Sequence, residues 1–329
     1  MTILAGFDIG GTKCAVSVGK WSNESIAILG KEQFPTPQDP KTAIELMISK
    51  FEELLITLKL KSAEAIGISC GGPLDSKRGY ILSPPNLPNW DEIDIVSPIK
   101  NRFSVPVGLQ NDANACGLAE WKWGAGKGCE NMIFLTFGTG MGAGLILNGN
   151  LYTGTNDMAG EVGHFRLEQN GPIGFGKAGS FEGFCSGGGI VKLARAKAVE
   201  WINEGNHPLF CPALQDIPHI TAKMVGEAAQ EGDPLALEIF KTVGYKLGQG
   251  LALLVDLLNP ERIVIGSIYG RQQSLLEPVT IETIKKEALP QSLAVCEIVP
   301  AGLGENVGDY ASLSVALHLL ENNTKGSEG

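Results

Sequence analysis

The stretch that decides the fold is FDIGGTK at residues 7–13. It follows the apolar run ILAG at residues 3–6 and continues into AVSV at residues 15–18. Apolar runs on both sides of a Gly-Gly pair predict two strands, at residues 3–9 and 14–18, joined by a tight turn, and a third strand is expected at residues 26–29. The chain therefore opens on a glycine-turned hairpin whose tip carries an acid, a hydroxyl and a lysine.

The rest of the first half alternates between helical and strand patterns. Asp39-Pro40 supplies an N-cap and a first-turn proline, and apolar residues at helical spacing follow, so an amphipathic helix is predicted at residues 40–60. Buried strands are expected at residues 65–70 and 105–109, and another helix at residues 113–123.

The second half repeats this plan. A strand at residues 131–137, a glycine-rich turn and a strand at 144–147 lead to Asn148-Gly149, a strong signal for a type I′ hairpin into residues 151–152. Strands at 262–266 and 294–299 are also expected. Helices are predicted near residues 188–203, 221–230, 234–258, 271–287 and 308–321.

A chain of 329 residues is longer than a single core usually spans. We expect an α/β protein of two lobes. The smaller lobe would comprise residues 1–118, completed by the helix at 308–321, and the larger lobe residues 119–307.

Composition excludes several kinds of partner. The net charge is −10 and no run of lysine or arginine occurs, which argues against nucleic acid and anionic membranes. The N-terminus lacks the basic region of a signal peptide, and the apolar run at 250–255 is too short to span a bilayer. Seven scattered cysteines without a C-x-x-C pair indicate reduced, buried thiols. We expect a cytoplasmic protein.

The first glycine turn has the character of a phosphate site. Phosphate oxygens can approach backbone N–H groups that no side chain shields, while Thr12 and Lys13 can add a hydroxyl and a charge. Asp8, at the strand end, could hold Mg²⁺ through water. An ordinary hairpin with a surface aspartate is the alternative.

The second glycine turn, GTGMGA at residues 138–143, matches a dinucleotide-binding pattern, but a strand follows it instead of a helix. A P-loop is absent, since Gly126-Lys127 is followed by Gly128. We interpret residues 138–142 as a second phosphate-contacting hairpin, with glycine flexibility alone as the alternative.

A third polar segment, QNDANA at residues 110–115, stands where a strand ends and a helix begins. Asp112 could accept a proton from a substrate hydroxyl that attacks a phosphoryl group. Asp112 or Asn111 could equally cap the helix.

Six motifs in fixed order carry a family resemblance. They are DIGGTK at 8–13, GGPLD at 71–75, SPPNLPNW at 83–90, QNDAN at 110–114, FGTGMGAG at 137–144 and GEVGH at 160–164. Together they resemble the ROK family of bacterial sugar kinases and sugar-responsive repressors over most of the chain. The resemblance implies a two-lobed, actin-like ATPase (ribonuclease H-like) fold with a central cleft, ATP with Mg²⁺, and transfer of phosphate to a sugar hydroxyl. A homodimer is also expected.

The resemblance also assigns roles to residues. Asp112 is the implied catalytic base. The implied contacts to sugar hydroxyls are Asn86, Asn111, Asp112, Glu161, His164 and Glu182. The implied contacts to ATP and its Mg²⁺ are Asp8, Gly10, Gly11, Thr12, Lys13, Gly138, Thr139, Gly140 and Gly266. Ser267 departs from the pattern, because a second glycine is common at that place.

A second departure concerns metal. After GEVGH the family usually continues into C-x-C-G-x-x-G-C-x-E, whose cysteines bind a structural Zn²⁺ together with the histidine. Here those positions are Ile173, Phe175 and Ser180, so a closed four-ligand zinc site cannot form and no zinc is expected. The loop is instead expected to be held by an apolar cluster. Its candidate members are Phe165, Ile173, Phe175, Phe181 and Phe184.

The expected function is that of a sugar kinase, with one alternative of a different class. We expect an ATP-dependent hexose kinase acting on the 6-OH of glucose or a related aldohexose; N-acetylhexosamine, fructose and β-glucoside remain alternative substrates. A sugar-sensing repressor is the alternative of a different class. Such repressors carry an N-terminal helix-turn-helix, for which a phosphate motif starting at residue 8 is expected to leave no room.

Overall fold

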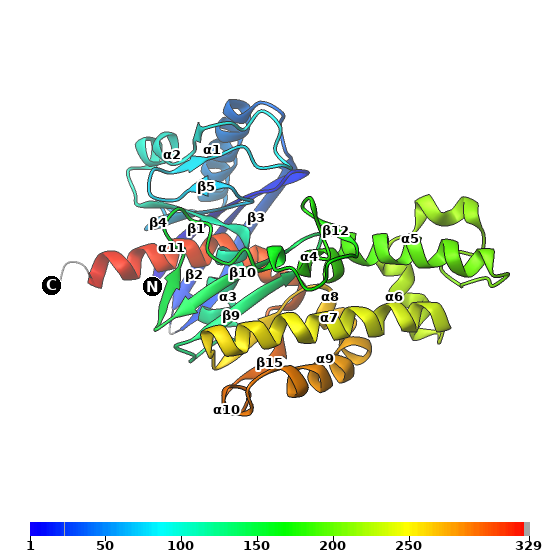
Figure 1. The fold of residues 1–329 in the computed structure, drawn as a ribbon. Helices are drawn as coiled ribbons and strands as arrows, with labels where there is room; N and C mark the ends of the chain where they lie inside the picture. Colours follow the sequence, from blue (N-terminus) through cyan, green and yellow to red (C-terminus); the bar gives the residue numbers. More distant parts are fainter. Residues whose placement is uncertain (23, 326–329) are drawn as a thin grey trace. The chain divides into compact units, whose positions relative to one another are not determined.

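The computed structural model describes residues 1–22 and 24–325 (Figure 1). Contacts between Cα atoms group the chain into two compact units. Unit 1 contains residues 1–130, 144–159 and 305 onward, and unit 2 contains residues 131–143 and 160–304. The lobe boundaries expected from the sequence stay a prediction.

Unit 1 is built on a five-stranded sheet of order β3-β2-β1-β4-β8. The opening hairpin is confirmed: β1 (Thr2–Ile9) pairs antiparallel with β2 (Lys13–Ser22). On the other side of β1 lie the parallel strands β4 (Ala65–Cys70) and β8 (Val107–Asn111). β3 (Ser25–Pro35) is longer than predicted because its residues alternate in exposure, so they form no apolar run.

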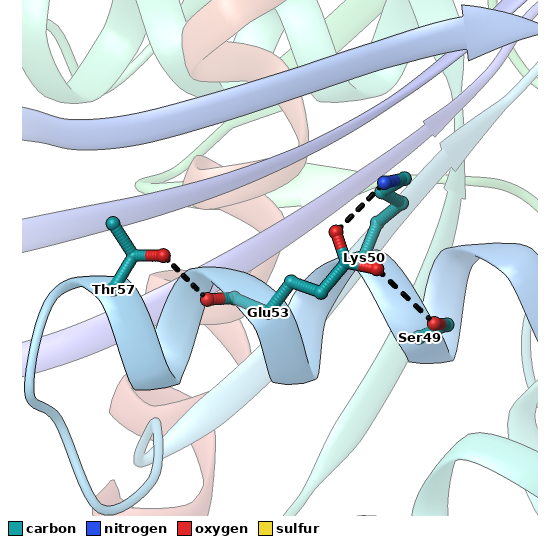
Figure 2. A network of polar contacts seen from close by, with 4 residues as sticks. All are labelled: Ser49, Lys50, Glu53 and Thr57. Atoms are coloured by element: carbon teal, nitrogen blue, oxygen red, sulfur yellow. Dashed lines mark hydrogen bonds and ion pairs between the residues drawn. The ribbon is translucent and has the colours of Figure 1, made fainter.

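Helices cover both faces of this sheet. α1 (Pro40–Thr57) is capped by Asp39, which accepts a hydrogen bond from the Thr42 N–H as predicted, and α1 packs against β2 and β3. Its solvent side carries the polar network of Figure 2. There Lys50 and Ser49 contact Glu53, whose backbone carbonyl accepts from Thr57 Oγ1 at 2.9 Å. The outer face of α1 is thus polar while its buried face completes the core.

The opposite face of the sheet is covered by α11 (Val307–Lys325), coloured red in Figure 1, which packs against β1, β4 and α3 (Asp112–Trp123). This packing is close because β4 carries Gly67. A Cβ there would collide with the backbone of Ser312 and Ala316. Leu4, Leu313 and Leu317 fill the interface around this contact. The short helix α2 (Val96–Phe103) precedes β8.

The second five-stranded sheet has the order β11-β10-β9-β14-β15. Its strands are β9 (Met132–Phe137), β10 (Met141–Leu147), β11 (Asn150–Tyr152), β14 (Arg262–Ile265) and β15 (Glu297–Pro300). Asn148 and Gly149 both have positive φ, as the predicted type I′ turn requires. In each sheet the third strand lies at one edge, followed by the second, first, fourth and fifth, so the expected internal repeat is confirmed. One of the four boundaries between the units falls within β10.

Unit 2 has a helical layer around the long helix α7 (Pro234–Leu258), against which α9 (Gln273–Glu287) packs. The further helices are α4 (Phe181–Phe184), α5 (Gly187–Asn203), α6 (Ala222–Gln230), α8 (Ile268–Arg271) and α10 (Pro290–Leu293). Short strand pairs were not predicted because two residues carry no periodic signal. They are β5 (Leu74–Asp75), β6 (Tyr80–Ile81), β7 (Ile93–Asp94), β12 (Ile173–Gly174) and β13 (Lys177–Ala178).

All seven cysteines lie within the described residues and are free thiols, five of them buried and two partly buried. Burial raises the pKa of the Cys70, Cys116 and Cys185 thiols, so these groups stay protonated. The expectation of largely buried thiols is confirmed. Within residues 1–22 and 24–325, no helix combines the length and apolarity that crossing a bilayer requires.

Candidate active site

Three parallel strands of unit 1 end side by side. The register pairs Asp8 of β1 with Ser69 of β4, and Cys70 of β4 with Asn111 of β8. Because the carboxyl ends of parallel strands meet at one edge of the sheet, Asp8 and the residue after β8, Asp112, come to the same edge. Ser69 also donates a side-chain hydrogen bond to the Asp8 carboxylate.

The two carboxylates influence each other. Burial raises the pKa of Asp8 to about 6, and the negative charge of Asp112 adds to this shift. Although solvent reaches the Asp112 side chain, the surrounding protein desolvates it and raises its pKa as well. Asp112 Oδ1 accepts a hydrogen bond from the Ala113 N–H at 2.8 Å. The edge therefore holds a pair of carboxylates that bind protons or cations more readily than isolated surface aspartates do.

The helix cap after β8 is Asn111. Its Oδ1 accepts from the Asn114 N–H at 2.7 Å, and its backbone is extended, as an N-cap requires. Asp112 is the first residue of α3 and not its cap. Of the two residues that the sequence offered as the cap, the structure thus uses Asn111. The carbonyl of the Asn111 side chain is thus used by the fold. Its amide group has no hydrogen-bond partner within residues 1–22 and 24–325 and remains available as a donor.

The first glycine turn is closed by bonds within the hairpin and from one distant residue. Gly10 N–H donates to the Lys13 carbonyl at 3.1 Å, and Thr36 Oγ1 donates to the Gly10 carbonyl at 2.5 Å. Thr36 N–H also donates to the Thr12 carbonyl. Gly11, Thr12 and Lys13 are exposed. The turn is therefore a fixed, open surface of backbone and polar side chains.

Asn86 lies against this turn. A Cβ on Gly11 would come within 2.5 Å of the Asn86 carbonyl oxygen, and one on Gly71 would lie 3.4 Å from the Asn86 side-chain oxygen. Gly11 is thus required by close approach, which the sequence could not reveal. Unit 1 brings together the predicted residues Asp8, Gly10, Gly11, Asn86, Asn111 and Asp112.

Unit 1 also contains the predicted residues Thr12 and Lys13, and unit 2 contains the rest. Glu182, beside the glycine turn, accepts a hydrogen bond from the Met141 N–H at 3.1 Å, and a Cβ on Gly140 would lie 2.9 Å from the same carboxylate oxygen. Gly187, which begins α5, donates its N–H to the Gly138 carbonyl at 2.7 Å. One oxygen of Glu182 is therefore used to hold the second hairpin.

His164 is the last residue of a 3₁₀ turn, Val162–His164. Glu161, directly before this turn, is exposed. The ring of Phe175 packs edge-on to the His164 ring with 5.4 Å between centroids, and Lys177 Nζ donates to the His164 carbonyl at 2.7 Å. In the described part of the chain, no three His, Cys, Asp or Glu side chains gather in a way that could hold a metal ion.

The expected apolar cluster under this loop is only partly present. Phe181 and Phe184 are buried, but Ile173 is 51% exposed and Phe175 69% exposed. The physical reason is that Phe175 and Gly176 form the positive-φ tip of the β12–β13 hairpin, which points its side chains outward.

Backbone hydrogen bonds and one buried serine hold the loop instead. Ser180, fully buried, caps α4 by accepting the Gly183 N–H at 3.1 Å. The Gly179 carbonyl accepts from the N–H groups of Leu167 and Glu168, and Phe181 N–H donates to the Phe165 carbonyl at 2.7 Å. Ser180 stands at one of the family's cysteine positions, and it serves the fold through a hydroxyl.

A cavity of about 700 Å³ opens in unit 2 beside the second glycine turn. Its lining includes Gly138, Thr139 and Ser267, together with three cationic side chains, Lys192, Arg195 and Arg271. Gly266, which precedes the lining residue Ser267, is buried, and a Cβ there would meet the ring of Phe134 at 3.2 Å. The cationic residues come from α5 and α8, and no periodicity or motif in the sequence predicts that they lie together.

Comparison with known proteins identifies the family. The model of the ROK family matches residues 4–317. The chain belongs to the ROK family. It is 33% identical over 312 residues to a glucokinase of Halalkalibacterium halodurans, covering 92% of this chain and 91% of the relative. It is also 28% identical to a xylose repressor of Bacillus spizizenii, covering 91% of this chain and 73% of the repressor.

Among solved structures, a ROK family glucokinase from Streptomyces griseus in complex with glucose and AMPPNP superposes with a TM-score of 0.75. It is 28% identical, and the match covers 96% of this chain and 99% of that one. The chain thus has the α/β, actin-like ATPase fold of the ROK sugar kinases.

The ROK motifs divide between the two units. Those with Asp8, Asn86 and Asp112 belong to unit 1, and those with Gly138–Gly140, Glu161 and His164 to unit 2. Two contacts in unit 1 lie outside any ROK motif named from the sequence: Ser69 bonds the Asp8 carboxylate, and Thr36 bonds the first turn. Single serines and threonines are too common to be predicted as site residues.

Proposed function

We propose that this protein is an ATP-dependent sugar kinase that phosphorylates a hexose hydroxyl, the 6-OH of glucose or of a related aldohexose. The observation that carries the proposal is the similarity, over nine-tenths of both chains, to a protein named glucokinase. The relative solved with glucose and AMPPNP supports the same pair of substrates.

Asp112 is the proposed general base. Within the described residues, the hydrogen bonds to its carboxylate come from the backbone N–H groups of Asp112 and Ala113 at the start of α3, so the carboxylate can still accept the hydrogen of a sugar hydroxyl. The pKa of Asp112 is raised by desolvation, which makes the carboxylate a stronger base than a surface aspartate. In phosphoryl transfer the remaining catalysis is positioning and charge stabilisation.

The residues present fit Mg²⁺. Asp8 and Asp112 place two carboxylates at one sheet edge, where burial and mutual repulsion disfavour their charges, and a hard divalent cation prefers such oxygen ligands. Asp8 would hold the ion, through water. Bound Mg²⁺ would neutralise charge on the phosphates of ATP. The fold itself supplies Ser69, which keeps the Asp8 side chain oriented.

The remaining roles follow the ROK motifs. We assign contacts to the sugar hydroxyls to Asn86, Asn111, Glu161, His164 and Glu182. We assign contacts to the ATP phosphates to residues 10–13 and 138–140, and a nucleotide-side contact to Gly266. The cationic cavity of unit 2 is the proposed pocket of the nucleotide. The loop at 165–181 is proposed to work without zinc, held by Ser180 and backbone hydrogen bonds.

A coupled assay of ADP formation tests the proposal. Purified protein with ATP and Mg²⁺ is given glucose, mannose, fructose, N-acetylglucosamine, N-acetylmannosamine or cellobiose. We expect turnover with glucose or a close aldohexose to exceed that with the others. A preference for another sugar would correct the substrate. Sugar binding by calorimetry without any turnover would favour a sensor related to the repressors.

A further inference from the structure

Ser267 holds an unusual backbone conformation. It joins β14 to α8 with φ 53° and ψ −113°, the mirror image of the common turn conformation near −60° and +120°. A residue with a Cβ is strained there, whereas glycine adopts the conformation without steric cost. Strain of this kind persists where the surrounding structure imposes it, and it gathers at functional sites.

The Ser267 side chain gains no hydrogen bond within the described residues that would offset this strain. Its side chain makes no cap to α8, and its hydroxyl has no hydrogen-bond partner within residues 1–22 and 24–325. The residue is half-buried, so the hydroxyl remains accessible to a ligand. A glycine at this place would serve the fold better than serine does.

The hydroxyl faces the second glycine turn. A Cβ on Gly138 would have Ser267 Oγ as its nearest neighbour, at 3.7 Å, and both residues line the 700 Å³ cavity. The same cavity is lined by Arg195, whose buried Nε also has no partner in the described residues. The Ser267 hydroxyl, which has no partner in the described residues, therefore belongs to the lining of a cavity that carries three cationic side chains, which is the environment that an anionic ligand needs.

We propose that the Ser267 hydroxyl donates a hydrogen bond to a phosphate oxygen of the bound nucleotide, a contact that the glycine common at this place in the family could not make. The inference rests on the proposed function, in which this cavity receives ATP. The strained backbone is maintained because it aims the hydroxyl along the glycine turn, at the side of the cavity where Gly138 and Thr139 would meet the phosphates.

Two variants separate the hydroxyl from the strain. Ser267→Gly removes both, and Ser267→Ala removes the hydroxyl but keeps a Cβ at positive φ. Calorimetric titration with AMPPNP and Mg²⁺ should show at least about a tenfold weaker Kd for each variant, because a hydrogen bond to a charged group is lost. Without nucleotide, Ser267→Gly should melt above the wild type and Ser267→Ala close to it.

Ligand and substrate controls locate the contact. Adenosine, which has no phosphate, should bind all three proteins equally, and the KM for sugar should stay unchanged while the KM for ATP rises. Unchanged AMPPNP binding in Ser267→Gly, with a wild type that binds, would overturn this inference and leave the proposed function standing. An equal loss for adenosine would overturn the phosphate assignment. A wild type that binds no nucleotide would instead remove the proposed function.

Discussion

Replacing Asp112 by asparagine should abolish most of the catalysis without disturbing the fold. Asparagine keeps an Oδ1 that can accept the Ala113 N–H, now bonded at 2.8 Å, so the start of α3 should be preserved. It cannot accept a proton from the sugar hydroxyl. Loss of a general base costs about 10²- to 10⁴-fold in rate, or about 3 to 5 kcal/mol of transition-state stabilisation.

The change in stability that Asp112→Asn causes can be predicted in sign. An acid whose folded pKa is raised binds its proton more tightly when folded, so its ionised form destabilises the fold above that pKa. Desolvation raises the pKa of Asp112, and its charge also opposes that of Asp8. A neutral amide removes both penalties, so Asp112→Asn should melt no lower than the wild type at pH 7.5.

The assay is the coupled measurement of kcat with the preferred sugar, with calorimetric titration of that sugar. Sugar affinity should change little, because asparagine can still bond a hydroxyl. Asp39→Asn is the matched control: it makes the same substitution in unit 1 at the cap of α1, where asparagine caps equally well, and kcat should stay at the wild-type value. The base assignment fails if Asp112→Asn retains more than about one-tenth of the wild-type kcat.

Three further predictions concern the fold and the loop. Ser180→Ala should lower the free energy of unfolding by about 2 kcal/mol in urea, because it removes the cap of α4 from a fully buried site; an unchanged midpoint would contradict that role. Gly67→Ala should destabilise strongly through its collision with the Ser312 backbone, whereas Gly308→Ala, where a Cβ meets nothing within 4 Å, should be neutral or stabilising in the same measurement. Elemental analysis of purified protein should find no stoichiometric zinc, and one zinc per chain would refute the hydrogen-bonded account of the loop that follows His164.

Helix starts and turns were predicted well from the sequence where a residue type strongly prefers one backbone conformation or one capping position. Asp39-Pro40 predicted the start of α1, and Asn148-Gly149 predicted the β10–β11 turn, because a cap, a fixed φ and two positive φ values are local properties. The paired glycines predicted the first hairpin for the same reason. Such features need no knowledge of the rest of the chain.

Contacts between distant residues could not be predicted in this way. Thr36 lies 26 residues from Gly10, whose carbonyl it bonds, and Asn86 approaches Gly11 across 75 residues. The apolar character of Phe175 suggested burial, but its place at the tip of a two-residue turn exposes it. In each case the tertiary fold, and not the residue type, decides the environment.

The two similar sheets carry different side chains at matching positions. Thr136 lies two residues before Gly138, as Asp8 lies two residues before Gly10, yet its hydroxyl accepts the Gly142 N–H at 2.9 Å and so closes its own hairpin. Asp8 instead bonds Ser69 on the neighbouring strand and keeps a charge that burial disfavours.

The strands that follow differ in the same way. The fourth strand of the first repeat runs into Gly71-Gly72, while the fourth strand of the second repeat runs into Gly266-Ser267. The fifth strand is followed by Asp112 in the first repeat and by Ala301 in the second. Since the two sheets share one backbone plan, they differ in the side chains at matching positions: a carboxylate pair follows the strands of the first sheet, and a strained serine beside a cationic cavity follows a strand of the second.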